Sequence, residues 1–483
     1  MNNKDRDSID FGKTDIPQLF AKLFVPTLMG LIFSAFYNIA DGVIVGHGVG
    51  SNALAAVNIA APIFLISSSF SLMFASGVSI VGAVHLSQGN TKAACINTTQ
   101  ALTVPLLAML ALVAVMQFGA RELCFLFGGS ELLYPYVSDY LHWLGLYPVF
   151  QLIMIEGSFV LRLDGSPNYA MMVNVVPSLL NVFLDWWLVY RQDWGIAGAA
   201  FATNFSAGFG TVMVLVYLLF FSKKIHLYKP KFSATALRLT ARNTSYMAKL
   251  GFPTFIGEGA ITCMIIAGNY MFMRTLGEDG VAAFGTCCYL FPLVFVFANA
   301  IAQSQLPIVS YNYGLGDKKR VRSAFKFAVV LAACCGALMT ILGVVASKPL
   351  VSLFIRTGTN AFRIGAEGFP YFALSFVLFS FNMVVIGFWQ SVERVAESVF
   401  FMLLRGLVFL VPVFVWLPSV MGVRGLWLAV PLSEVLTCMV IVFVTIRQRR
   451  KIYLDCRTPP NGKGHGKTDV FIERLHSAGG NIG

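Results

Sequence analysis

The sequence predicts an all-α integral membrane protein with twelve transmembrane helices, arranged as two six-helix lobes related by a pseudo-twofold axis. Three observations predict this fold. Of the 483 residues, 57% are hydrophobic and only 12% are charged, with a mean hydropathy of +0.73, whereas a soluble domain carries about 25% charged residues. Twelve long apolar segments follow one another along the chain, and the second half repeats features of the first.

The apolar segments are long enough to cross a hydrocarbon core of about 30 Å as helices. Polar or glycine-containing connections of varied length separate them. The segments cover residues 17–46, 52–84, 93–119, 133–161, 168–190, 195–221, 246–274, 280–309, 320–346, 365–391, 398–419 and 424–446.

Lys and Arg gather in every second connection and near both ends of the chain, with Lys348, Arg356 and Arg363 as exceptions. The positive-inside rule therefore places both termini in the cytoplasm, and the net charge of +12 reflects membrane orientation, with no nucleic-acid partner expected. The expected division is a cytoplasmic N-terminal segment (1–15), an N-lobe (16–221), a cytoplasmic linker (222–245), a C-lobe (246–449) and a disordered cytoplasmic tail (450–483).

An internal repeat links the two halves. The stretch AKLFVPT at 21–27 returns as AKLGFPT at 248–254, 227 residues later. The same offset aligns Gly89 with Gly316, Gly195 with Gly422, and Gly198 with Gly425. Because six crossings return the chain to its starting side, both halves have the same orientation, and a pseudo-twofold axis along the membrane normal follows.

Three helices of the first half each carry a polar stripe on one face. Polar or small residues in the first, fifth and sixth segments recur at steps of three and four, which is the spacing of one helix face. The stripes consist of Ser34, Asn38 and Asp41; of Asn174, Ser178, Asn181 and Asp185; and of Ala199, Thr203 and Ser206.

Two of these stripes end in a carboxylate, Asp41 and Asp185. A charge at membrane depth costs at least about 2.5–3.5 kcal/mol, so we expect the stripes to face inward and meet. Two carboxylates are what a small cation or a proton needs; the alternative is that Asn181 and Asp185 only tie helices together. The repeat places Gly268 and Pro412 at the equivalents of Asp41 and Asp185, which argues against a merely architectural role.

The second half has an intramembrane acid of its own, Glu258, on the seventh segment. Asn299 and Gln303 on the eighth segment and Asn382 on the tenth could line the same space. The simpler interpretation of Glu258 is a hydrogen-bonded carboxyl group near a helix break. We therefore treat these four residues, together with Asn38, Asn174 and Ser178, as candidates for the transport cavity or for a second ion site.

Several stretches together resemble the multidrug and toxic compound extrusion (MATE) family, most closely its MepA-like branch. The longest is VPTLMGLIFSAFYNIADGVIVGHGVGSNALAAV at 25–57, with the acid in helix 1. The others are SQGN at 87–90 and its repeat YGLGD at 313–317, the Asn-x-x-x-Asp of the fifth segment, and GIAGAAFAT at 195–203. The resemblance covers both halves, roughly residues 15–450.

The resemblance implies a secondary antiporter that exports organic cations or drugs by alternating access, driven by inward flow of Na⁺ or H⁺. In relatives a coupling ion is held by a helix-1 Asp, a helix-5 Asn and Asp, and a helix-6 Thr with a nearby carbonyl. These positions hold Asp41, Asn181, Asp185, Thr203 and Ala199. Glu258 matches the helix-7 Glu of a C-lobe site in some relatives, whereas Asn382 stands on helix 10, where those relatives have an Asp.

Other classes of function fit less well. The chain has no nucleotide-binding GxxxxGK[ST] motif and no HExxH motif, and we expect neither an enzyme nor a cofactor. A lipid-linked saccharide flippase of the same superfamily is the alternative, but it would need cationic residues in its cavity to bind pyrophosphate. We expect a monomer in the bacterial inner membrane, and the choice between Na⁺ and H⁺ stays open.

Overall fold

The computed structural model describes residues 9–229 and 233–454. The first half forms ten helical elements and the second half nine. In the first half they are α1 (Ile16–Gly48), α2 (Ser51–Ser87), α3 (Thr91–Phe118), α4 (Ala120–Leu126), α5 (Tyr134–Leu144), α6 (Tyr147–Leu163), α7 (Pro167–Trp186), the π-helix η1 (Trp187–Arg191), α8 (Gly195–Val216) and the π-helix η2 (Tyr217–Phe221). In the second half they are α9 (Ala234–Gly314), α10 (Lys318–Val345), α11 (Ser347–Ser352), α12 (Asn360–Ala373), α13 (Ser375–Ser391), α14 (Val395–Leu403), the π-helix η3 (Leu404–Val408), α15 (Leu410–Met421) and α16 (Val423–Leu454).

The twelve predicted spans are all found in these elements. Within the described residues, nine helices are long and apolar enough to cross a membrane. The longest of them, α9, contains a non-helical residue at Gly277 and comprises the seventh and eighth spans. Two pairs bent by 50° and 40°, α5 with α6 and α12 with α13, supply the fourth and tenth. Nine helices, one of them counted twice, and two bent pairs give twelve spans.

The backbone repeats together with the sequence. Glycines with positive φ recur 227 residues apart at helix ends, since Gly50 (117°) matches Gly277 (66°) and Gly89 (74°) matches Gly316 (77°). An L side chain is strained in this region, so the two halves use the same residue at the same turn. In the helices α6 and α13 and at the turn that follows them the offset is 228, since Gly165 (85°) corresponds to Glu393 (60°). It returns to 227 at Gly195 (57°) and Gly422 (60°).

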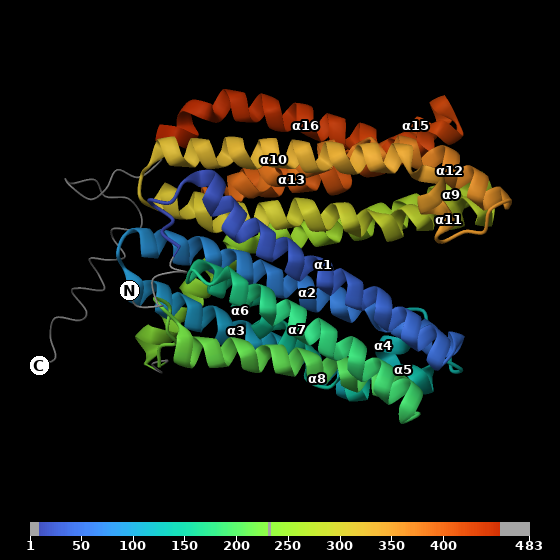
Figure 1. The fold of residues 1–483 in the computed structure, drawn as a ribbon, viewed down its shortest axis with the longest axis horizontal. Coiled ribbons are helices and arrows are strands. Elements are labelled where there is room, and N and C mark those ends of the chain that lie inside the picture. Colours follow the sequence, from blue (N-terminus) through green and yellow to red (C-terminus); the bar gives the residue numbers. More distant parts are fainter. Residues whose placement is uncertain (1–8, 230–232, 455–483) are drawn as a thin grey trace, which may run out of the picture.

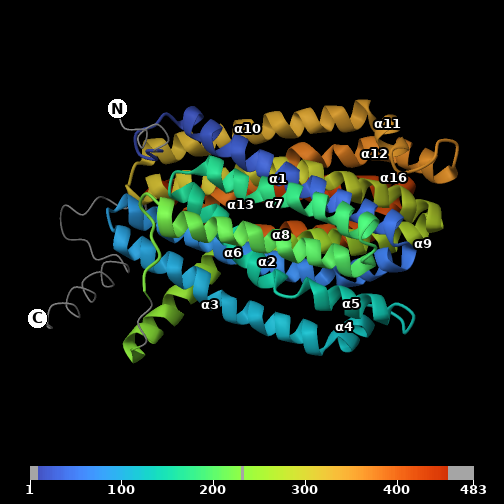
Figure 2. The ribbon, with the colours of Figure 1, turned by 60° about the horizontal axis from the view of Figure 1, so that its bottom comes forward.

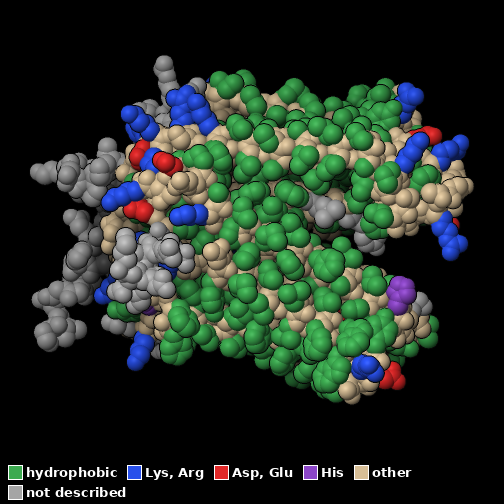
Figure 3. All heavy atoms as spheres, viewed as in Figure 1, with side chains coloured by type: hydrophobic (Ala, Val, Ile, Leu, Met, Phe, Trp, Pro, Cys, Tyr) green, Lys and Arg blue, Asp and Glu red, His purple; other side chains and the backbone are tan. Residues whose placement is uncertain are grey.

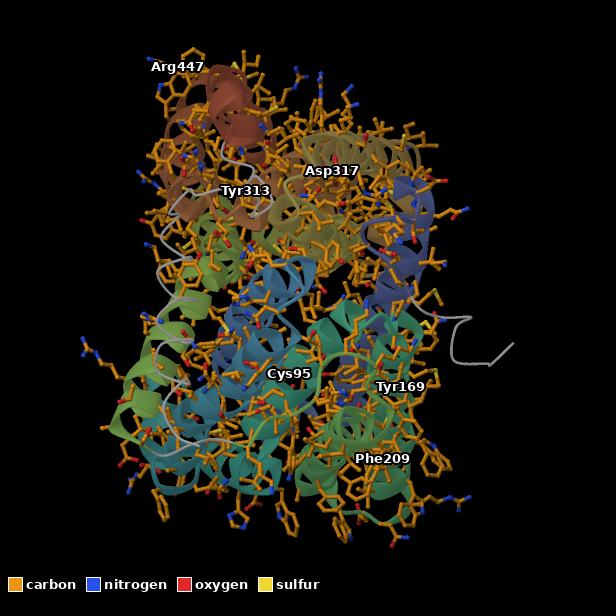
Figure 4. All side chains as sticks on the ribbon, turned by 90° about the vertical axis from the view of Figure 1, so that its left-hand side faces the viewer. Cys95, Tyr169, Phe209, Tyr313, Asp317 and Arg447 are labelled. Atoms are coloured by element: carbon orange, nitrogen blue, oxygen red, sulfur yellow. The ribbon has the colours of Figure 1, made fainter. Side chains whose placement is uncertain are left out.

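The helices form two lobes, α1 to η2 and α9 to α16, that lie side by side (Figures 1 and 2). The lobes contact each other at the end where α1 begins and α16 ends, and they diverge toward the other end (Figure 1). We call these the closed end and the open end. Figure 4 looks onto the closed end, with Cys95 and Tyr169 on one lobe and Tyr313 and Asp317 on the other.

Close backbone packing of α2 against α9 holds the closed end together. A Cβ atom added at Gly251 would clash with the backbone carbonyl of Met73, and one added at Gly77 with that of Met247. Each helix therefore approaches the other through a glycine, which is how helices pack closely in membranes. We call this contact between the lobes the seam.

The segment before α1 also reaches the second lobe. Ile9 and Phe11 are buried in one apolar cluster with residues of α9, α10 and α13. The backbone oxygen of Phe11 accepts hydrogen bonds from Asn312 Nδ2 (3.1 Å) and Arg320 Nη2 (2.9 Å). The described part of the predicted N-terminal segment is thus bound to the C-lobe at the closed end.

Two helices extend well beyond the apolar spans predicted for them. The seventh span was predicted from residue 246, but α9 begins at Ala234, inside the predicted linker 222–245, because polar residues continue the helix outside the apolar segment. The last helix continues to Leu454, five residues into the predicted disordered tail, so that the tail prediction is wrong for residues 450–454. Residues 455–483 of that tail and residues 1–8 of the N-terminal segment lie outside the described residues.

Apolar side chains cover the middle of the bundle surface. In Figure 3 they form a broad band, while Lys, Arg, Asp and Glu lie at the two ends. This arrangement matches a bilayer, whose hydrocarbon core excludes charge and whose two surfaces accept it.

Candidate functional site

The polar stripes of α1, α7 and α8 meet in the first lobe. Helix α1 packs along α7, with Gly30 against Asn174, and α7 packs along α8. The carboxyl groups of Asp41 and Asp185 lie close enough to interact with each other. The amide Nδ2 of Asn181 donates to Thr203 Oγ1 at 3.3 Å. The structure therefore brings together four of the five residues predicted to hold a coupling ion.

This carboxyl cluster, which we define as Asp41, Asn181, Asp185, Thr203 and Ser206, is rich in oxygen atoms that lack a donor. Asp185 is fully buried, and neither of its carboxyl oxygens accepts a hydrogen bond from a donor in the described structure. The same holds for Asp41 Oδ1, Asn181 Oδ1 and Ser206 Oγ. Buried polar atoms without partners are costly, so a proton or a small cation between these oxygens would stabilise the cluster.

The fifth predicted residue, Ala199, is buried in α8 one turn before Thr203. Its carbonyl belongs to a stretch that is helical on both sides. It becomes available as an ion ligand only where the helical hydrogen bond to residue 203 opens.

Three tyrosines complete the surroundings of the carboxyl pair. Tyr37 and Tyr140 lie close enough to Asp41 and Asp185 to interact with them electrostatically, and Tyr147 lies near Tyr37. The sequence analysis missed these residues. Tyr37 stands next to Asn38 in the α1 stripe, which was the one available signal; Tyr140 and Tyr147 come from the bent α5–α6 pair, whose approach depends on tertiary packing.

A cavity of about 330 Å³ lies between the lobes, and Figure 3 shows the surface hollowed between them toward the open end. Its apolar lining includes side chains such as Leu72, Met154 and Phe295. Ten predicted residues line it, three of which also belong to the carboxyl cluster: Ser34, Asn38, Asn174, Ser178, Asn181, Thr203, Ser206, Glu258, Asn299 and Gln303. The cavity and the cluster therefore share Asn181, Thr203 and Ser206.

Glu258 reaches this cavity from the second lobe. Neither a hydrogen bond nor an ion pair of its carboxyl group is found within the described residues. The nearby Gln303 Nε2 donates to Asn299 Oδ1 at 3.1 Å. Glu258 is thus the carboxylic acid among the residues that line the cavity, which makes it a candidate partner for a positive group.

Asn382 does not line the cavity. It is buried within the second lobe, where Nδ2 donates to Glu434 Oε2 at 2.7 Å. Glu434 in turn forms a buried ion pair with Arg405 (2.7 Å), whose guanidinium lies 4.0 Å from the ring centre of Phe379. The acids Glu258 and Glu434 therefore occupy separate places, and Asn382 belongs to the second of them.

Comparison with known proteins agrees with this architecture. The MatE family model matches residues 26–187 and again residues 253–416, once in each half. An FAD transporter from Shewanella oneidensis is 25% identical over 87% of this chain and 92% of its own length. A multidrug export protein MepA from Staphylococcus haemolyticus is 21% identical over 94% of this chain and 98% of its own.

A solved structure shows the same fold. A MOP superfamily transporter from Pyrococcus furiosus superposes with a TM-score of 0.83 over 93% of this chain and 98% of that chain, at 20% identity. The two matched halves, the twelve spans and the cavity between two lobes lead to one conclusion: the chain is a multi-pass membrane transporter of the MatE (multidrug and toxic compound extrusion) family.

Proposed function

We propose that this transporter exports organic cations in exchange for Na⁺ or H⁺ that flows inward. The observation that carries the proposal is the carboxyl cluster, where two acids on neighbouring helices present oxygens without donors. Low dielectric and a like-charged neighbour both disfavour two bare carboxylates, so the pair holds at least one cation when it is closed to water. Glu258 in the cavity favours cargo of positive charge.

The shared residues give the ion and the cargo a route to influence each other. Asn181 and Thr203 belong to the carboxyl cluster and also line the cavity. Ion binding draws α1 and α7 together around Asp41 and Asp185, and Pro26 within α1 supplies a place where that helix can bend. A ligand shifts such an equilibrium only by its different affinity for the two states. The ion would favour the state from which the cargo is released.

We further propose that the closed end is cytoplasmic and that the protein lies in a bacterial inner membrane with both termini inside. The excess of Lys and Arg in the connections at that end supports this orientation. The described conformation would then have its cavity accessible from outside.

Two alternatives for the cargo are weaker. A saccharide-lipid flippase needs several cationic groups for pyrophosphate, and Arg162 is the one Lys or Arg among the described residues that line the cavity. The relative from Shewanella is named for FAD, which carries phosphate groups; a single arginine is a smaller counterpart than a pyrophosphate requires.

Gradient-driven uptake of ethidium into inverted vesicles tests the proposal. Asp41→Asn and Asp185→Asn should each abolish uptake while the folded protein remains at wild-type levels. Asp139→Asn is the matched control, because this acid is exposed and lies outside the cluster, and its uptake should be unchanged. Full uptake by both cluster variants would reduce Asp185 to a tie between helices.

A further inference from the structure

Arg162 is a buried cation at the end of α6, and the proposed export of cations gives it no role. Its side chain is 5% exposed and lines the cavity between the lobes. Nη1 donates to Thr27 Oγ1 of the same lobe (3.0 Å) and to Gln303 Oε1 of the other lobe (2.9 Å). Nε donates to the backbone oxygen of Ser158 at 3.1 Å. The guanidinium therefore joins the two lobes through hydrogen bonds.

All these acceptors are neutral. Within the described residues no carboxylate forms an ion pair with Arg162 and no acceptor bonds its Nη2. Nη2 is also absent from the polar atoms that are sealed from solvent without a partner. The Nη2 edge of the guanidinium therefore faces the cavity, while Nε and Nη1 hold the group in place. Its central carbon Cζ lies over the ring of Phe159, 4.3 Å from the ring centre.

The internal repeat supplies a built-in comparison for this cluster. With the offset of 228 that applies within α6 and α13, Gln390 corresponds to Arg162. With the offset of 227, Thr254 corresponds to Thr27 and Ser76 to Gln303.

Two of the contacts of Arg162 recur at Gln390, which also donates to the backbone oxygen of Leu250 (2.9 Å). Gln390 Nε2 donates to Thr254 Oγ1 of its own lobe (3.0 Å) and to Ser76 Oγ of the other lobe (3.3 Å). Two matching polar clasps, one on each side of the pseudo-twofold axis, therefore join the lobes. In one clasp the donor is a neutral amide, so joining the lobes does not require a charge.

The charge of Arg162 is thus not needed to join the lobes, and no counter-ion for it is found within the described residues. We propose that Arg162 binds an oxyanion of the cargo, a carboxylate or a phosphate, at the inner end of the cavity. A guanidinium edge is well suited to such a group. This inference rests on the proposed transport function and extends its cargo from organic cations to molecules that also carry an oxyanion.

The test is equilibrium binding to the full-length protein in nanodiscs, by fluorescence polarisation. Three probes separate the chemistry: rhodamine 110 has a free carboxyl group, rhodamine 123 is its methyl ester, and FMN carries a phosphate. Arg162→Gln gives the clasp the amide found in its counterpart. Arg162→Gln should lower the affinity of the protein for rhodamine 110, for FMN or for both by about tenfold to a hundredfold. This is the effect expected from the loss of one charge-assisted hydrogen bond. Binding of rhodamine 123 should be unchanged.

Two further variants separate the effect of the charge of Arg162 from the effect of the contacts that join the lobes. Arg162→Lys keeps a cation and should retain much of the affinity for the oxyanion probes. This variant tests the role of the charge even if Arg162→Gln folds poorly. Gln390→Ala breaks the matching clasp without changing charge, and should not distinguish rhodamine 110 from rhodamine 123. A loss of affinity for rhodamine 110 would identify the bound group as a carboxylate, and a loss of affinity for FMN would identify it as a phosphate.

Equal weakening of all three probes by Arg162→Gln would overturn the proposal, since Arg162 would then act only on lobe packing. The proposal would also be overturned if the wild-type protein bound neither rhodamine 110 nor FMN. A failure of the proposed export function would be a separate result, because inverted vesicles with the wild-type protein would then show no gradient-driven uptake of rhodamine 123.

Discussion

At the scale of single residues, the molecule separates two kinds of buried charge. Asp41 and Asp185 are two acids close together, and Asp41 Oδ1 and both carboxyl oxygens of Asp185 lack a donor within the described residues. Arg405 and Glu434 instead form an ion pair in which the acid also accepts from Asn382. The first arrangement calls for an added cation, while the second is complete in itself. Their charges therefore predict opposite roles, ion binding for the first and structural stability for the second.

The carboxyl pair should behave as one unit. Since either single substitution already removes the shared site, the Asp41→Asn, Asp185→Asn double variant should transport ethidium as poorly as each single variant, within about twofold. Initial rates in inverted vesicles at matched protein levels measure this. Residual transport in the single variants that the double variant then loses would mean two independent sites.

The ion pair in the second lobe should matter for stability. Glu434→Ala leaves Arg405 buried without its partner, which costs about 3–5 kcal/mol, and the melting temperature of the purified protein should fall clearly. The control is Glu131→Ala, whose ion pair with Arg121 is largely exposed and should contribute little. An equal effect of both substitutions would contradict a structural role for the buried pair.

At the scale of elements, the approach of α2 to α9 decides how the closed end forms. Backbone carbonyls of Met73 and Met247 occupy the space where Gly251 and Gly77 would carry a side chain. Backbone atoms cannot move aside as the end of a flexible side chain can. The seam therefore depends on two small residues rather than on the polar clasps alone.

Gly251→Ala should force the closed end apart. Spin labels on Lys92 of α3 and Lys318 of α10, which are both exposed and belong to different lobes, should report a longer distance or a broader distribution. Gly259→Ala is the matched control in α9, because nothing lies within 4 Å of its added Cβ, and the label distances should stay as in the wild type. An unchanged distribution in Gly251→Ala would show that this contact does not set the closed end.

At the scale of the whole molecule, two lobes of similar backbone carry different chemistry. The turn glycines, the bent helix pairs and the threonines of the clasps recur in both halves. The carboxyl cluster occurs in the first lobe, and the Arg405–Glu434 pair occurs in the second. In the proposed function the repeat supplies a frame for alternating access, and the carboxyl cluster of the first lobe is the predicted site of the coupling ion.

Orientation is a prediction for the whole molecule. In a background without native cysteines, single Cys residues at Lys92, Lys229 and Lys318 should react with a membrane-impermeant maleimide only in inverted vesicles. All three positions lie at the closed end or in the linker, which the positive-inside rule assigns to the cytoplasm. Labelling of Lys229→Cys in intact cells would reverse the proposed orientation.

Hydropathy and spacing were sufficient to predict the twelve spans, the repeat, and the stripes on α1, α7 and α8. These are local or periodic properties, since a span needs only a long apolar segment and a stripe only a helical period. The prediction that the stripes meet also needed little more, because lipid excludes polar faces. The sequence by itself thus determined the fold class and most members of the candidate ion site.

The tertiary structure decided which side chains meet across different helices. Asn382 was grouped with Glu258 from the sequence, yet it binds Glu434, and Arg162 was given no role although it lines the cavity between two lobes. Periodicity gives the face of each helix but neither its depth nor its bend, and the breaks at Gly277 and in the α5–α6 and α12–α13 pairs change both. That Arg162 and Gln390 occupy corresponding places between the lobes could therefore be recognised only after the two lobes were packed together.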